Sequence, residues 1–162
     1  METSGYTILL VEDDPNDVLL MQRAFRKANL AIALNVAHNG QEAIEYLNHQ
    51  GKFADETRFP LPTLMLLDLK MPRMDGFETL EWLRQQPGLR RIVAVVLSSS
   101  SEITDINRAY DLGANSYLVK PGEFKTLVEL VKLLATYWLA INKNSELQNE
   151  REAICMMPMG ET

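Results

Sequence analysis

The stretch Leu64-Met-Leu-Leu-Asp68-Leu-Lys-Met-Pro72-Arg-Met-Asp-Gly76 decides the fold. It begins as an unbroken apolar run and ends in turn residues, with the carboxylate of Asp68 at the junction. A short apolar run bounded by turn residues is typical of a strand buried on both faces, although periodicity alone does not exclude a buried helix. If the run is a central parallel strand, Asp68 lies at its carboxyl end, where open α/β sheets place their ligands. Asp68 is therefore the first candidate for a functional residue.

Four other runs have the length and composition of strands, and helical patterns separate all of the strands from one another. These runs cover 6–11, 32–36, 92–97 and 116–119, and apolar residues at helical spacing cover 15–28, 43–47, 77–84, 103–112 and 124–141. Strict alternation of strand and helix indicates a mostly parallel sheet with helices on both faces, which is a doubly wound α/β fold. We expect one domain over residues 1–141, and a polar helix extension over 142–162 that ends in a disordered tail.

Composition excludes some classes of protein. The chain has 162 residues, a net charge of −6 and a pI of about 5.0. An acidic chain is not expected to bind nucleic acid directly, because phosphate binding needs a surplus of Lys and Arg on some face. The single cysteine, Cys155, allows no internal disulfide. Since we find no signal peptide and no apolar stretch long enough to cross a membrane, we expect a cytoplasmic protein.

Polar residues with complementary chemistry follow four of the five predicted strands. Glu12 and Asp13 follow the first, Asp68 the third, Ser98 the fourth and Lys120 the fifth. In a doubly wound sheet these strand ends meet at one edge. Clustered carboxylates repel one another, and Mg²⁺ relieves that repulsion because it prefers oxygen ligands and pairs with phosphate. A carboxylate can also act as a nucleophile and form an acyl phosphate, with a lysine and a hydroxyl stabilising the charge.

Four motifs together resemble the receiver domain of two-component response regulators over roughly Ile8 to Leu139. They are Val11-Glu-Asp-Asp14, Leu67-Asp-Leu-Lys-Met-Pro72 with Met74-Asp-Gly76, Val96-Leu-Ser98, and Ser116-Tyr-Leu-Val-Lys-Pro121. The resemblance implies a flavodoxin-like domain with strand order 2-1-3-4-5. It also implies a phosphoacceptor switch, not an enzyme, that signals through contacts with other proteins.

The resemblance assigns the acceptor and the metal ligands residue by residue. Asp68 would take a phosphoryl group from a sensor histidine kinase. Asp13 would bind Mg²⁺ directly, Glu12 would act at the metal partly through water, and Asp68 and the backbone carbonyl of Lys70 would be further ligands. Glu12 stands where aspartate is frequent in the family, but it keeps the carboxylate that the role requires.

The resemblance also assigns the residues that respond to phosphorylation. Ser98, at a position where threonine is frequent, would bind the phosphoryl group, and Lys120 would pair with it. The peptide bond between Lys120 and Pro121 is expected to be cis. Tyr117 matches an aromatic residue that swings inward as Ser98 moves, and the alternative for Tyr117 is a simple half-buried strand aromatic.

Other interpretations remain open at this point. A pseudo-receiver would act as a constitutive interaction module without phosphate, which the intact set of strand-end residues argues against. An Mg²⁺-dependent phosphohydrolase would need a second catalytic acid near its nucleophile, and Leu69 and Lys70 supply none. Asp14 is expected as a helix N-cap, Asp17 as a charge in the first helical turn, and Asp75 as a cap in the turn before the third helix.

The last helix carries more apolar residues than one buried face requires. The simpler explanation is that these residues form a wide apolar stripe that packs against the core. The more specific explanation is that the extra apolar residues form a homodimer surface, because aromatic residues are enriched at such contacts. Receivers often pair through the fourth helix, fifth strand and fifth helix, and the expected surface here consists of Tyr110, Leu130, Leu133, Tyr137 and Trp138. The segment Ala109–Tyr117 and this long helix resemble stand-alone response regulators of cyanobacterial phytochromes, which implies a phytochrome as the kinase.

Overall fold

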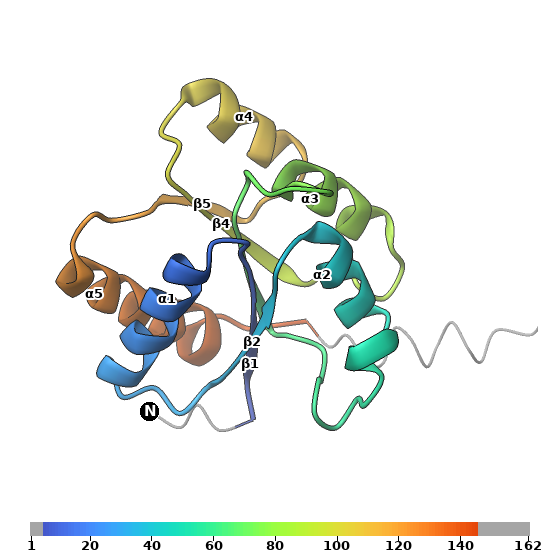
Figure 1. Cartoon of the computed structure of the whole chain (residues 1–162), viewed down its shortest axis with the longest axis horizontal. Helices are drawn as coiled ribbons and strands as arrows, with labels where there is room; N and C mark the ends of the chain where they lie inside the picture. The colour runs from blue at the N-terminus through green and yellow to red at the C-terminus, as the bar shows by residue number, and fades with distance from the viewer. Residues whose placement is uncertain (1–4, 146–162) are drawn as a thin grey trace, which may run out of the picture.

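The fold is a doubly wound α/β sandwich, seen in a computed structural model that describes residues 5–145. Five parallel strands form one sheet in the order β2-β1-β3-β4-β5, as predicted (Figure 1). The strands are β1 (Thr7–Val11), β2 (Ala33–Ala37), β3 (Leu64–Leu67), β4 (Val93–Ser98) and β5 (Ser116–Val119). The helices are α1 (Pro15–Lys27), α2 (Gly40–Leu47), η1 (Gly51–Phe53), α3 (Gly76–Gln85), α4 (Ile103–Asp111), α5 (Phe124–Ala135) and η2 (Thr136–Ile141).

The two faces of the sheet bury alternate residues of the same strands. Leu9, Met65 and Val96 face a core closed by α2, α3 and α4. Their neighbours Leu10 and Leu66 face a second core closed by α1 and α5, which lie side by side in Figure 1. Because successive side chains of a strand point to opposite faces, continuous apolar runs such as Leu64–Leu67 serve both cores.

Local sequence explains where the helices next to the strand ends begin and stop. Asp14 caps α1 by accepting a hydrogen bond from Asn16 N, with Pro15 in the first turn. Asp75 caps α3 by accepting from Glu78 N. Gly113 follows the end of α4 with φ +102°, a conformation that glycine adopts without strain. The capping roles predicted for Asp14 and Asp75 are confirmed.

The polar helix extension predicted after Ile141 is wrong over residues 142–145. The last helix changes from α5 to a π-helical segment at Thr136, and it ends at Ile141 with Asn142 in an extended conformation. Asn142, Lys143 and Asn144 offer no apolar side chain to bury, so packing does not prolong the helix. The remainder of the predicted extension, 146–162, including Cys155, lies outside the described residues.

The loop between α2 and β3 contains a small aromatic cluster. Phe53 in η1 is buried, and its ring centroid lies 5.1 Å from that of Tyr46 and 5.2 Å from that of Phe59. Two aromatic residues inside a polar, proline-containing stretch were the signal for this packing. Within the described part of the chain, no helix is both long and apolar enough to span a lipid bilayer.

Candidate functional site

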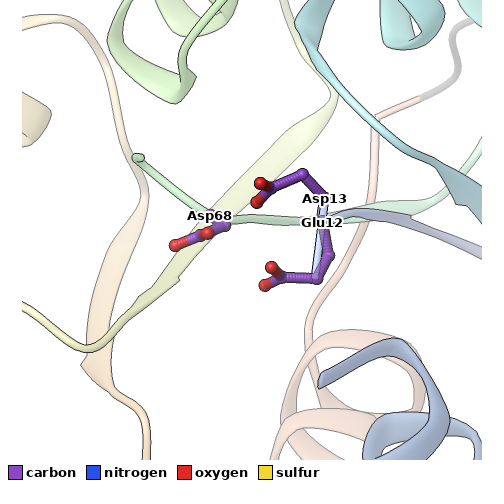
Figure 2. A group of neighbouring side chains, drawn as sticks. All are labelled: Glu12, Asp13 and Asp68. Carbon is purple, nitrogen blue, oxygen red and sulfur yellow. The ribbon is translucent and has the colours of Figure 1, made fainter. Parts of the chain in front are cut away.

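The carboxyl ends of β1 and β3 bring three carboxylates together. Figure 2 shows Glu12 and Asp13, directly after β1, with their side chains near that of Asp68, directly after β3. One carboxylate oxygen of each residue lies within 4.8 Å of the other two. Glu12 and Asp68 are buried, whereas Asp13 is open to solvent. The predicted cluster therefore forms, with one side accessible from outside.

This cluster fits a hard divalent cation. Its donors are all carboxylate oxygens, and Mg²⁺ holds such ligands at about 2.1 Å, so that opposite ligands lie about 4.2 Å apart. The three carboxylate oxygens lie within 4.8 Å of one another, so one cation can reach all three residues. Lys70 lies two residues after Asp68 in the loop before α3, and a metal-binding role for its carbonyl stays a prediction.

Burial makes the charged forms of these acids unfavourable. It raises the pKa of Glu12 to about 7, a shift that a hydrogen bond from Lys120 opposes and the charge of Asp68 reinforces. Burial also raises the pKa of Asp68, against the opposing effects of the Lys120 charge and of a 2.9 Å hydrogen bond from Leu69 N. Two buried acids with raised pKa values at a strand edge indicate a functional site rather than a structural one.

Lys120 places its ammonium group beside the acids. The Nζ atom donates hydrogen bonds to Glu12 Oε2 at 2.7 Å and to Asp17 Oδ2 at 2.8 Å, and it lies 3.8 Å from Asp68 Oδ1. Burial alone would lower the pKa of Lys120, but the hydrogen bonds to Asp17 and Glu12 outweigh it and raise the pKa. Asp17, expected only as a first-turn charge, is thus also a partner of the site lysine. The signal for it was its place in the first turn of a helix that starts directly at the site.

Ser98 and Tyr117 belong to a hydrogen-bonded loop on the other side of the site. Ser98 is buried, and its Oγ accepts from Ser100 N at 3.1 Å, which leaves its own hydroxyl proton to be donated. Tyr117 is half-buried, and its hydroxyl donates to Ser100 O at 2.8 Å. Ser100 Oγ in turn donates to Asp105 Oδ2 at 2.6 Å. Sequence reasoning missed Asp105, whose only pattern is an acid in the first turn of α4.

The predicted cis peptide bond before Pro121 is wrong, because the described residues contain no cis peptide bond. The trans form of an X–Pro bond is favoured by about 0.5–1 kcal/mol unless the surrounding structure reverses that preference. A Lys-Pro pair in the sequence does not report the surroundings. Lys120 reaches its partners at the site with the trans bond.

The residues predicted for a dimer surface divide into two groups. Tyr110, Leu133 and Tyr137 are exposed at 48%, 68% and 51%. Leu130 and Trp138 are half-buried and pack against the core between α1 and α5. The apolar excess on the last helix is thus real, but part of the predicted surface serves the core.

A model of the response regulator receiver domain matches residues 8–132. The chain belongs to this family. Response regulator Rcp1 of Synechocystis sp. is 36% identical over 132 residues, 82% of this chain and 88% of Rcp1. A probable methanogenesis regulatory protein, FilR2 of Methanothrix harundinacea, is 36% identical over 140 residues, 86% of this chain and 87% of FilR2.

Solved receiver structures share this architecture. The phosphorylated cyanobacterial phytochrome response regulator RcpA superposes with a TM-score of 0.78 at 35% identity, covering 87% of this chain and 99% of RcpA. The Mn²⁺-bound form of Rcp1 superposes with a TM-score of 0.76 at 34% identity, again covering 87% of this chain and 99% of the other. Receivers similar to this chain thus include one with a phosphoryl group and one with a divalent metal.

Proposed function

We propose that this receiver is a Mg²⁺-dependent phosphoacceptor switch in which Asp68 takes a phosphoryl group from a sensor histidine kinase. The observation that carries the proposal is that the Asp68 carboxylate belongs to the acidic cluster and lies 3.8 Å from the Lys120 ammonium. RcpA in its phosphorylated form and Rcp1 with Mn²⁺ support the same chemistry. A pseudo-receiver would not require this arrangement of buried charges.

The chain's own residues supply the parts of the reaction. An oxygen of Asp68 attacks the phosphorus of a phosphohistidine, the new O–P bond forms as the P–N bond breaks, and the electron pair of that bond returns to the imidazole. Lys120 pairs with the phosphoryl oxygens, and Ser98 donates its hydroxyl proton to one of them. Glu12, Asp13 and Asp68 would hold a divalent ion, which would offset further negative charge on those oxygens.

Phosphorylation would then change the hydrogen bonding, and with it the conformation, of the loop after β4. When Ser98 turns toward the phosphoryl group, its bond with Ser100 N changes, and Ser100 also holds Tyr117 and Asp105. A local charge change thereby reaches α4 and β5. In this proposal the phosphorylated state is read from the face that these two elements form.

The test is phosphoryl uptake from a small phosphodonor such as acetyl phosphate. We expect one phosphoryl group per chain by intact-mass spectrometry in the presence of Mg²⁺, and none after removal of Mg²⁺ with EDTA. Asp68→Asn should take up none. Asp75→Asn is the matched control, because Asn also caps a helix, and it should behave as the parent does. A parent that stays unmodified with Mg²⁺ contradicts the proposal and favours the pseudo-receiver.

We also propose that a second copy of the chain covers the exposed apolar residues of α4, β5 and the last helix. Tyr110, Val119, Leu133 and Tyr137 are exposed there, and aromatic and aliphatic residues are enriched in the cores of homodimer interfaces. Light scattering should show a dimer for the parent, at least when phosphorylated, and a monomer for Leu133→Glu. Leu19→Glu, which changes an exposed leucine on α1, should leave the dimer intact. A parent that is monomeric in both states removes this part of the proposal.

The similarity to RcpA, a cyanobacterial phytochrome response regulator, favours a phytochrome as the kinase, in the cytoplasm, where a kinase has ATP. FilR2 is equally identical to this chain and is named for the regulation of methanogenesis, so identity alone does not select the kinase. Phosphotransfer from an autophosphorylated phytochrome, compared with an unrelated histidine kinase, decides the question. Faster transfer from the unrelated kinase contradicts the phytochrome link.

A further inference from the structure

The ammonium of Lys120 has two close anionic partners, and neither is the predicted phosphoacceptor. Glu12, at the end of β1, and Asp17, in the first turn of α1, accept its hydrogen bonds at 2.7 Å and 2.8 Å. Asp68 Oδ1 is 3.8 Å away, beyond hydrogen-bonding distance. The metal-binding and phosphoryl roles above assign nothing to Asp17, although it is as close to the lysine as Glu12 is.

We propose that Asp17 is a positioning residue for Lys120. The Asp17 carboxylate holds the Lys120 ammonium toward α1 and away from Asp68 until a phosphoryl group on Asp68 competes for the ammonium. This inference rests on the proposed function, because it concerns the group that Lys120 binds after phosphorylation. It assigns to Asp17 a restraining role: its carboxylate weakens the binding of the phosphoryl group at Asp68.

The surroundings of the two partners show which bond gives way. The side chain of Glu12 is 4% exposed, whereas that of Asp17 is 37% exposed. Water competes better for an exposed ion pair, so the bond to Asp17 is the weaker of the two. A phosphoryl dianion on Asp68 therefore displaces Asp17 before it displaces Glu12.

Charge acts in the same direction as bond competition. Asp17 is a fourth carboxylate at a site that already holds Glu12, Asp13 and Asp68, and it repels a phosphoryl dianion bound nearby. Replacing Asp17 with Asn removes this repulsion and weakens the hold on one N–H of Lys120. Both consequences strengthen phosphoryl binding, and Glu12 still orients the lysine.

The structure also provides room for the lysine to move. A cavity of about 50 Å³ adjoins the site, and Asp17, Asp68 and Lys120 are among its lining residues. Leu20 of α1 and Pro121 line it as well. The ammonium can therefore pass from Asp17 toward Asp68 without a rearrangement of the core.

The experiment measures Mg²⁺-dependent binding of beryllofluoride, a stable analogue of the phosphoryl group, by calorimetry. We expect Asp17→Asn to bind beryllofluoride about threefold more tightly than the parent, a size that fits a partly exposed ion pair. Asp17→Ser should show the same direction. Asp14→Asn is the matched control: Asp14 is exposed, lies in the same segment and caps α1 through Asn16 N, so Asn keeps the cap and affinity should not change.

Binding of Mg²⁺ alone distinguishes a restraining role of Asp17 from an effect on the metal. Mg²⁺ binding without beryllofluoride should be equal or somewhat weaker in Asp17→Asn, because the variant lacks one carboxylate near the metal site. Tighter Mg²⁺ binding, by the same factor as for beryllofluoride, would assign the effect to the metal and overturn the inference. A parent that binds beryllofluoride, with an Asp17→Asn variant that binds equally well or more weakly, also overturns it while leaving the proposed function in place. A parent that does not bind beryllofluoride contradicts the proposed function, and the inference fails with it.

Discussion

Two partly buried polar centres of this chain, one around Arg84 and one around Asp68, have opposite character. Arg84 lies at the end of α3, and each of its five N–H groups reaches an oxygen acceptor: the carbonyls of Arg90, Ile92 and Gly113 and the side chain of Asn115. Around Asp68, in contrast, several acids share one lysine, and burial raises the pKa values of Glu12 and Asp68.

The difference shows how a buried charge stabilises a fold in one place and is available for chemistry in another. Every donor of Arg84 has a partner, so the side chain ties α3 to the loop between α4 and β5 and to the start of β4. The acids at the strand ends have too little positive charge around them, so the site is suited to binding a divalent cation, which in turn offsets the negative charge of a phosphoryl group. Neutralising a charge should therefore destabilise the first centre and stabilise the second.

The largest expected effect is the loss of stability in Arg84→Met. The variant leaves the carbonyls of Gly113 and Ile92 without their charged donor, and we expect the free energy of unfolding to fall by about 3 kcal/mol. Urea unfolding followed by circular dichroism measures it. Arg23→Met, at an exposed position on α1, is the control and should stay within about 0.5 kcal/mol of the parent. A loss below about 1 kcal/mol for Arg84→Met would remove its role as a structural tie.

The second effect concerns the pH dependence of Mg²⁺ binding. Glu12 must lose its proton to act at the metal, and its pKa is about 7, so protons compete as the pH falls through 7. We expect Mg²⁺ affinity to fall about tenfold between pH 8 and pH 6, which is about 1.4 kcal/mol. In Glu12→Gln the affinity should be lower at pH 8 and nearly independent of pH over this interval. An equally steep dependence in that variant would place the titrating group elsewhere.

In the absence of metal, Asp68→Asn should change the free energy of unfolding less than Arg84→Met does, and in the opposite direction. The pKa of Asp68 is raised on folding, so the folded chain binds protons more tightly than the unfolded chain, and stability declines as the pH rises above the unfolded pKa. At pH 8, well above the unfolded pKa, this penalty is present, and Asn removes it. We expect the variant to be more stable than the parent in urea unfolding at pH 8, whereas Asp75→Asn should change little. If Asp68→Asn is less stable than the parent, the charge of Asp68 does not destabilise the folded state.

Local patterns in the sequence were sufficient for the fold and for much of the site. The apolar runs place the strands, and the residues that follow each run place Glu12, Asp13, Asp68, Ser98 and Lys120 at one edge. This works because parallel strands put all their carboxyl ends on the same side.

Features that depend on packing between distant segments were not predictable in this way. Arg84 shows in the sequence only as one residue of a helical pattern, and its partners lie 6 to 31 positions away. The bond between Lys120 and Asp17 joins residues 103 positions apart. The isomer of the bond before Pro121 likewise depends on surroundings that no local pattern reports.

The phosphoacceptor role of Asp68 can be tested by locating the phosphoryl group after treatment of the parent with Mg²⁺ and a phosphodonor. Acyl phosphates are labile, so reduction with borohydride before proteolysis would fix the modified position for tandem mass spectrometry. We expect a single modified residue, Asp68, in the peptide that spans β3 and the loop after it. Modification at Asp13 or Asp75 instead, or at no residue, would contradict this role.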